Sequence, residues 1–121
     1  MSRHIKQGNG WRIGWDAAAP EFPGLVGAET WAIELTEAEF NDFCQLVGRL
    51  AEAMQQIAGE LMAEEAVSCE VESERLWLEA EGYAQSYGLR MIVLSGRRCE
   101  GQWDAIATPP LIQATQTLTV F

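Results

Sequence analysis

Hydrophobic and polar positions alternate near the start of the chain, in the stretch GNGWRIGWD. Trp11, Ile13 and Trp15 fall on one side of an extended backbone, and the residues between them fall on the other. A period of two is typical of a half-buried strand, so we predict a strand over residues 10–16. Residues 17–27 contain two prolines and two glycines and are expected to form a loop.

Two later stretches alternate in the same way. AETWAIEL, residues 28–35, predicts a second strand. AVSCEVESERLWLEAEG predicts a hairpin with a two-residue turn at Ser73 and Glu74. That turn would place Glu72 opposite Arg75 on the outer face of the hairpin.

A long helix is expected between these strands. Thr36 followed by Glu39 is the pattern of a capping box, which marks a helix N-terminus. Apolar residues then recur at alternating intervals of three and four, which predicts a helix over residues 37–63, roughly 40 Å long at the usual rise per residue. We call these residues the helix seam: Phe40, Phe43, Val47, Leu50, Met54, Ile57 and Leu61.

The last third of the chain predicts two more strands and a short helix. Residues 89–94 are apolar on both sides, as in a central strand, and residues 102–107 would form its partner. Thr108 and Pro109 mark the start of a short helix. The expected fold is therefore α+β: one domain over residues 1–121, with a curved antiparallel sheet of about six strands, the long helix packed on it and a short C-terminal helix.

The length of the helix seam predicts self-association. Strands of ordinary length span about 17–20 Å, so a small sheet should leave part of the seam uncovered. We therefore expect a homodimer in which helix 37–63 contributes to the interface. The competing interpretation is a monomer whose second half covers the whole helix.

The charge is strongly negative and unevenly distributed. The net charge is −10, which disfavours nucleic acid and anionic membranes as partners. Residues 1–15 and 82–98 nevertheless contain no acidic residue. This distribution is either incidental to a solvated surface or the sign of a local basic face. The cations of the two segments are Arg3, Lys6, Arg12, Arg90, Arg97 and Arg98.

The residues that usually carry out catalysis do not form a recognisable group. The one histidine, His4, lies near a terminus that we expect to be frayed. The cysteines are Cys44, Cys69 and Cys99; they form no CxxC pair, which favours free thiols and a cytoplasmic protein without zinc. Alternating glutamates in the hairpin are typical of a solvated sheet face. We expect no enzymatic activity, no cofactor, no metal and no membrane segment.

The tryptophans are the remaining residues that bear on function. Trp11 and Trp15 are expected in the core, whereas Trp77 and Trp103 are expected to be accessible beside arginines. The leading hypothesis is a binding or assembly module that acts through protein or self-association. One alternative is single-stranded nucleic-acid binding, and another is a small apolar ligand under the curved sheet. The predicted nucleic-acid or partner surface comprises Arg12, Trp77, Tyr87, Arg90, Arg97, Arg98 and Trp103.

Three features together carry a resemblance to a known family: GNGWRIGWD, SGRRCEGQW and the closing helix that begins with prolines. The chain resembles a small family of cyanobacterial proteins, also present in chloroplast-bearing lineages, that has no assigned activity. The resemblance implies a fold like that of the Whirly-type single-stranded-DNA-binding regulators, with strands and a helix repeated twice and helices that pair subunits. Whirly proteins bind DNA through a lysine-rich strand motif. This chain has one lysine, Lys6, and no such motif, so no DNA-binding residue is carried over.

Overall fold

The computed structural model describes residues 3–60 and 64–118 and contains two four-stranded antiparallel sheets and two helices. Sheet A has the order β1 (Arg3–Gly8), β2 (Trp11–Asp16), β3 (Gly24–Gly27) and β4 (Ala32–Leu35). Sheet B has the order β5 (Ala66–Glu72), β6 (Leu76–Tyr83), β7 (Ser86–Val93) and β8 (Glu100–Trp103). The helices are α1 (Glu37–Ala58) and α2 (Thr108–Leu118).

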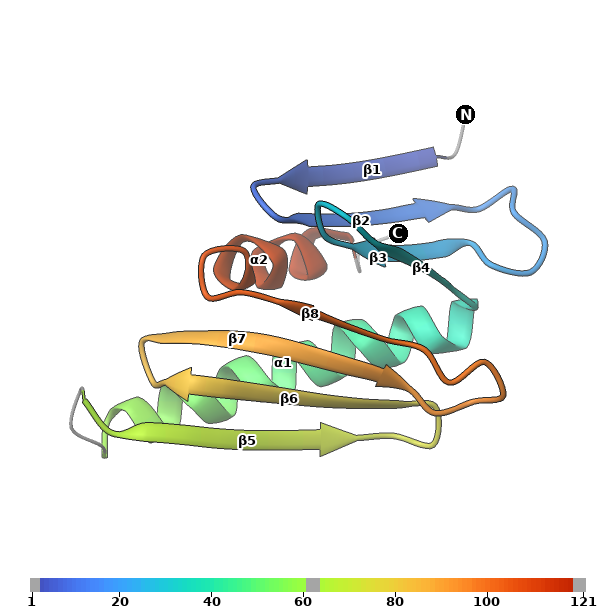
Figure 1. Ribbon diagram of the computed structural model, residues 1–121. Coiled ribbons are helices and arrows are strands. Elements are labelled where there is room, and N and C mark those ends of the chain that lie inside the picture. Colours follow the sequence, from blue (N-terminus) through green and yellow to red (C-terminus); the bar gives the residue numbers. More distant parts are fainter. Residues whose placement is uncertain (1–2, 61–63, 119–121) are drawn as a thin grey trace.

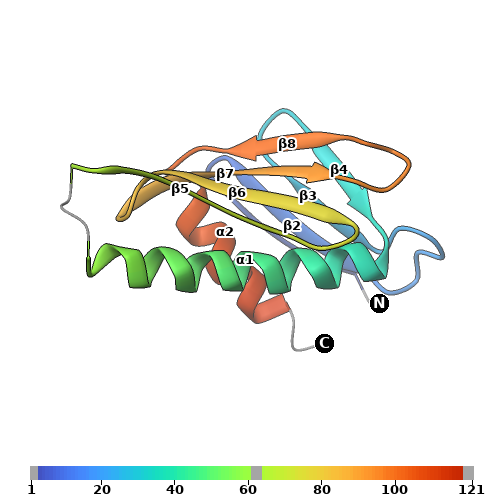
Figure 2. The same ribbon diagram turned by 90° about the horizontal axis from the view of Figure 1, so that it is seen from below.

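The two helices share one core with the inner faces of both sheets. Figures 1 and 2 show α1 running along one face of sheet B. The shorter helix α2 crosses α1 and lies next to sheet A. α1 contacts β5 and β6 of sheet B and reaches β3 and β4 of sheet A, while α2 packs against β2, β7 and α1. The α+β class, the antiparallel pairing, the long helix and the short C-terminal helix are therefore confirmed.

The number of strands and their division into two sheets differ from the prediction. The expected single sheet of about six strands is wrong, because eight strands form two sheets. His4 lies in an ordered strand although its terminus was expected to be frayed, because residues 3–8 pair with β2 over their whole length. Gly24–Gly27, expected in a loop, forms β3: a Cβ at Gly24 would lie 2.6 Å from the ring of Phe40, so glycine here permits close packing on α1.

The hairpin in sheet B forms, but in another register. Glu72 lies opposite Trp77 instead of Arg75. The connection is closed by the Ser73 N–H, which donates to the Leu76 carbonyl at 2.8 Å, while the Ser73 hydroxyl oxygen accepts from the backbone N–H groups of Arg75 and Leu76. These serine hydrogen bonds stabilise a tight connection that contains no glycine. The strand register therefore differs by two residues from the predicted one.

The strand boundaries toward the C-terminus also differ. β7 begins at Ser86, before the predicted residues 89–94, and β8 covers Glu100–Trp103 where residues 102–107 were expected. The chain leaves the sheet after Trp103 because the Asp104 carboxylate accepts the N–H groups of residues 106 and 107, which turns the backbone toward α2.

The capping box at the start of α1 is confirmed, but the helix is shorter than predicted. The Thr36 hydroxyl accepts the Glu39 N–H at 3.1 Å, and the Glu39 carboxylate accepts the Thr36 N–H at 2.9 Å. The helix ends at Ala58, with Gly59 as its C-cap, before the predicted residue 63.

The helix seam is covered by the chain's own sheets and α2. Its first five members, from Phe40 to Met54, are buried, Ile57 is half-buried, and Leu61 lies outside the described residues. The five buried side chains are not accessible to a partner in this fold, so a dimer interface on this helix would have to use its other side chains. The homodimer itself stays a prediction. The two sheets together cover the helix length that one small sheet would have left exposed.

Candidate binding surface

The outer face of sheet B is open to solvent. Every second residue of its strands points inward; Leu76, Leu78 and Leu89 are among those buried, and both helices contact this inner side. The opposite set of side chains is covered by neither helix (Figure 2). We call it the acidic face: Ser68, Glu70, Glu72, Trp77, Glu79, Glu81, Arg90, Ile92, Glu100 and Gln102.

The acidic face holds five glutamates and one arginine. Glu70 lies directly opposite Glu79 on the neighbouring strand, an arrangement in which like charges destabilise a sheet. Ser68 donates a hydrogen bond to Glu79 at 3.0 Å, and Arg90 forms an ion pair of 3.7 Å with Glu100. These contacts offset only part of the repulsion, so the face keeps a strong negative potential.

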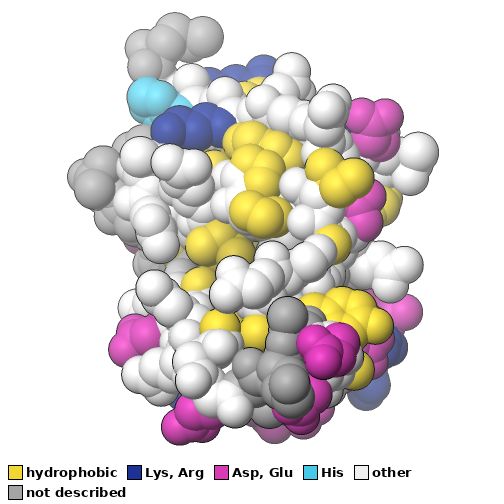
Figure 3. Space-filling view, turned by 90° about the vertical axis from the view of Figure 1, so that its left-hand side faces the viewer, with side chains coloured by type: hydrophobic (Ala, Val, Ile, Leu, Met, Phe, Trp, Pro, Cys, Tyr) yellow, Lys and Arg dark blue, Asp and Glu magenta, His cyan; other side chains and the backbone are white. Residues whose placement is uncertain are grey.

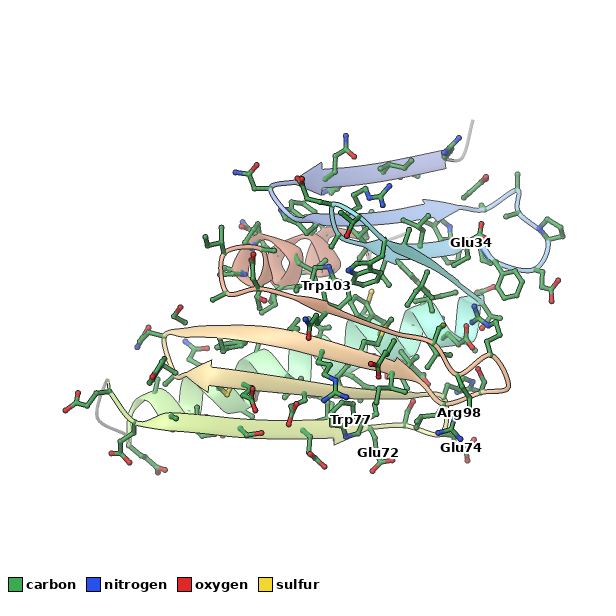
Figure 4. The ribbon with its side chains drawn as sticks, in the orientation of Figure 1. Glu34, Glu72, Glu74, Trp77, Arg98 and Trp103 are labelled. Atoms are coloured by element: carbon green, nitrogen blue, oxygen red, sulfur yellow. The ribbon has the colours of Figure 1, made fainter. Side chains whose placement is uncertain are left out.

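Trp77 provides an aromatic surface within this charge. It lies on β6 between Glu72 on β5 and Ile92 on β7, and it is half-buried. The Arg90 guanidinium lies 5.5 Å from the centroid of its ring. Figure 4 shows Trp77 on the outer side of the sheet, with Glu72 beside it. An accessible indole that already contacts one cation is suited to contact another.

A hollow of about 340 Å³ continues the acidic face toward β8. Its lining includes Glu79, Glu81, Arg90, Glu100 and Gln102. Gly88 forms the floor on β7, where a Cβ would approach the Trp103 carbonyl oxygen to 2.8 Å. The hollow is open and polar, which fits an extended polar or charged side chain better than an apolar ligand.

The predicted surface residues do not all come together. Trp77 and Arg90 meet on the acidic face, whereas Arg12 lies in sheet A. The Arg12 guanidinium donates to the carbonyls of Ala28 and Trp31 at 3.1 and 3.0 Å, so it holds the loop between β3 and β4. The two acid-free segments therefore do not merge into one basic face through Arg12 and Arg90.

Arg97 is also engaged within the molecule. Its guanidinium forms an ion pair with Glu39, donates to the Glu34 carbonyl and lies 4.7 Å from the ring centroid of Phe22. Ser95 donates to the second oxygen of the Glu39 carboxylate at 2.7 Å. The loop that contains Ser95 and Arg97 is thereby tied to the N-terminus of α1.

These contacts determine the ionisation of Glu39. Burial disfavours the charged carboxylate and is the largest single influence on it. Hydrogen bonds from the Thr36 backbone and the Ser95 hydroxyl, together with the Arg97 guanidinium, outweigh burial and hold the pKa of Glu39 below its ordinary value. Glu39 is therefore a charged group that organises the structure, at a distance from the acidic face.

Trp103 is not accessible, contrary to the prediction. It is 3% exposed, and its indole N–H donates to the Gly27 carbonyl at 2.8 Å. Its ring packs against Trp31 and Phe43, with centroids 5.0 and 5.8 Å away. Figure 4 shows it turned away from the outer side of sheet B. The strand register explains the difference, because Trp103 pairs with inward-facing Leu89.

The remaining predicted residues occupy different environments. Tyr87 is half-buried, and burial raises its pKa. Arg98 is exposed in the loop before β8 and has a positive φ of 48°. All three cysteines are free thiols, and burial raises the pKa of Cys44 to about 12.

A metal site and a membrane-spanning helix are two further features to consider in residues 3–60 and 64–118. No group of three or more metal-ligating side chains is found in these ranges. None of their helices is long and apolar enough to span a membrane.

The glutamates of the hairpin were predicted only as part of a solvated sheet face. The alternation of glutamates in the hairpin was visible, but Glu100 lies before the strand predicted over residues 102–107. Their place beside Arg90 depends on the pairing of β7 with β8, which local periodicity does not encode.

Comparisons with known proteins identify relatives without an assigned role. A family model described as a domain of unknown function, DUF1818, matches residues 6–118. A crystal structure of a protein of unknown function from Prochlorococcus sp. NATL2A, described as from the DUF155 family, superposes with a TM-score of 0.90. The two sequences are 28% identical, and the match covers 95% of this chain and 98% of that one. No curated protein matches the chain.

Proposed function

This chain belongs to the DUF1818 family, and we propose that it is a non-enzymatic binding module whose acidic face binds a positively charged segment of a partner protein. The observation that carries the proposal is the uncovered set of five glutamates around Trp77. In the isolated chain this arrangement places like charges opposite each other. A partner that brings lysine or arginine side chains would relieve that repulsion.

The acidic face combines the two features that a protein interface needs. Trp77 and Ile92 offer apolar area at its centre, and tryptophan is a frequent anchor in interfaces. The surrounding glutamates provide steering and specificity more than affinity. The net charge of −10 acts in the same direction, because it attracts a basic partner at long range.

A fluorescent lysine- and arginine-rich peptide tests this proposal. We expect saturable binding that weakens with added salt. Replacing two charges of the acidic face, in the double variant Glu79→Gln and Glu81→Gln, should lower affinity about tenfold, in the range found for charge pairs at the rim of an interface. The matched control is Glu52→Gln with Glu60→Gln, which removes the same charge from exposed positions on and just after α1. Equal weakening by both pairs would show nonspecific attraction and contradict the proposal.

Single-stranded nucleic acid is the weaker candidate. The arginines proposed for it are engaged: Arg12 and Arg97 bond within the chain, and Arg90 lies among glutamates. In a fluorescence titration at low salt with a labelled oligonucleotide, we expect no saturable binding at micromolar concentration, because phosphates would meet the acidic surface. Micromolar affinity, lost in Arg98→Ala, would contradict this expectation.

The proposed relation to the Whirly-type architecture is supported by the order of elements. Four strands and a helix occur twice in succession along the chain. This relation concerns the fold, and it transfers no DNA-binding residue. An apolar ligand under a curved sheet has less support, because the inner faces of both sheets pack directly on the helices.

A further inference from the structure

One end of the molecule presents apolar side chains from a fixed backbone. Ile106 is 75% exposed, the highest value among the large hydrophobic residues described in the structure. The Asp104 carboxylate accepts the N–H groups of Ile106 and Ala107 at 3.0 and 2.8 Å, and the Thr108 hydroxyl donates to the Asp104 carbonyl at 2.7 Å. Ile106 is therefore held outward by an ordered turn, so docking against it requires little further ordering.

Neighbouring elements extend this surface. The β1–β2 turn packs against the same region, since a Cβ at Gly10 would lie 3.3 Å from that of Ala107. Trp11 after this turn is half-buried, and Pro109 at the start of α2 is exposed. Figure 3 shows this side of the molecule, where hydrophobic side chains run through its middle and charged side chains stand mainly around its rim.

A recess lies at the same end of the molecule. It is a hollow of about 410 Å³ between the end of α1 and the β6–β7 turn. Its lining carries no charged residue and mixes apolar side chains with amides: Ala51, Gln55, Ala58, Gly59, Ala84, Gln85 and Tyr87. Figure 1 places the turn before α2, the β6–β7 turn and the end of α1 at one end of the fold. A projecting isoleucine and an uncharged recess thus share one surface.

We propose that this end is the interface of a two-fold homodimer, with Ile106 of each copy seated toward the recess of the other. The charge distribution of the protein favours a second copy of the chain as the partner at this surface. In a protein of net charge −10, self-association is least opposed where the contacting side chains are uncharged. A projection and a recess on one surface are complementary to themselves under two-fold symmetry, which gives a closed dimer. This proposal does not depend on the acidic face.

Sedimentation or light scattering of the full chain tests it. We expect a mass of twice 13.4 kDa at tens of micromolar. Ile106→Glu should give a monomer, because it buries two carboxylates in an interface that offers them no positively charged partner. Ile5→Glu is the matched control: Ile5 is 50% exposed on β1, so the same charge is added to another apolar position and the dimer should persist.

A second variant separates the interface from a general effect on folding. Ala84→Glu charges the recess and should also give a monomer, with a circular dichroism spectrum like that of the unaltered protein. A mass of 13.4 kDa for the unaltered chain at these concentrations would overturn the proposal. So would a dimer that survives Ile106→Glu, or one that Ile5→Glu disrupts equally.

Discussion

Replacing Trp103 by alanine is expected to lower the free energy of unfolding by about 4 kcal/mol, the range for removing a large buried aromatic side chain. Trp103 joins the two halves of the fold: it belongs to β8 in sheet B, bonds the Gly27 carbonyl in β3 and packs on Phe43 in α1. Its loss removes buried apolar area and leaves a carbonyl without its donor. Urea unfolding followed by circular dichroism measures the effect.

Two further variants separate the contributions to this loss. Trp103→Phe keeps much of the packing but lacks the indole N–H, so we expect a cost of about 1–2 kcal/mol. Trp77→Ala changes the half-buried tryptophan on the outer side of the same sheet and should cost roughly 1 kcal/mol. Equal destabilisation by Trp77→Ala and Trp103→Ala would contradict the assignment of Trp103 to the core.

Replacing Arg97 by alanine is expected to cost about 1–2 kcal/mol at neutral pH, because the Glu39 carboxylate loses its ionic partner but keeps its hydrogen bonds from Thr36 and Ser95. The Glu39 side chain is only 5% exposed, whereas the Arg97 side chain is 34% exposed, so water replaces part of the lost interaction. Arg49→Ala, at an exposed position on α1, is the control and should change stability by less than about 0.5 kcal/mol.

The pH dependence of stability gives an independent reading of the same contact. Since the pKa of Glu39 is lowered in the folded state, its ionisation stabilises the fold above its ordinary pKa of 4.5, and this contribution is lost as the pH falls through the lowered value. Without Arg97, burial is less fully compensated and the folded-state pKa rises. Urea unfolding between pH 3 and 7, a range of about four units around the ordinary carboxyl pKa, should show the variant losing less stability than the unaltered protein as the pH falls, so that the two curves converge at low pH. Parallel curves for the two proteins would contradict the role of Arg97.

Local sequence signals predicted what local interactions determine. The capping box at Thr36 and Glu39 fixed the start of α1 correctly, because both of its hydrogen bonds lie within four residues of each other. The alternation at Trp11, Ile13 and Trp15 likewise identified β2. Neither signal depends on how distant parts of the chain are arranged.

Features that depend on distant contacts were missed. Glycines in β3 resemble turn residues, and only the approach of Phe40 explains why that strand requires Gly24. Trp103 was expected to be accessible because it lies near Arg97 and Arg98 in the sequence, whereas its pairing with Leu89 turns it into the core. Ile106 was assigned to that strand, although the side chain of Asp104 turns the chain away from the sheet before it.

A titration of isotope-labelled protein with the lysine- and arginine-rich peptide, followed by amide and indole nuclear magnetic resonance shifts, tests the proposed function most directly. The largest changes should occur at the indole N–H of Trp77 and in β6 and β7, around Glu79, Glu81 and Arg90. They should diminish in Trp77→Ala and with added salt. Changes spread evenly over the acidic positions of the molecule, including Glu52 on α1, would contradict a binding surface on the outer face of sheet B.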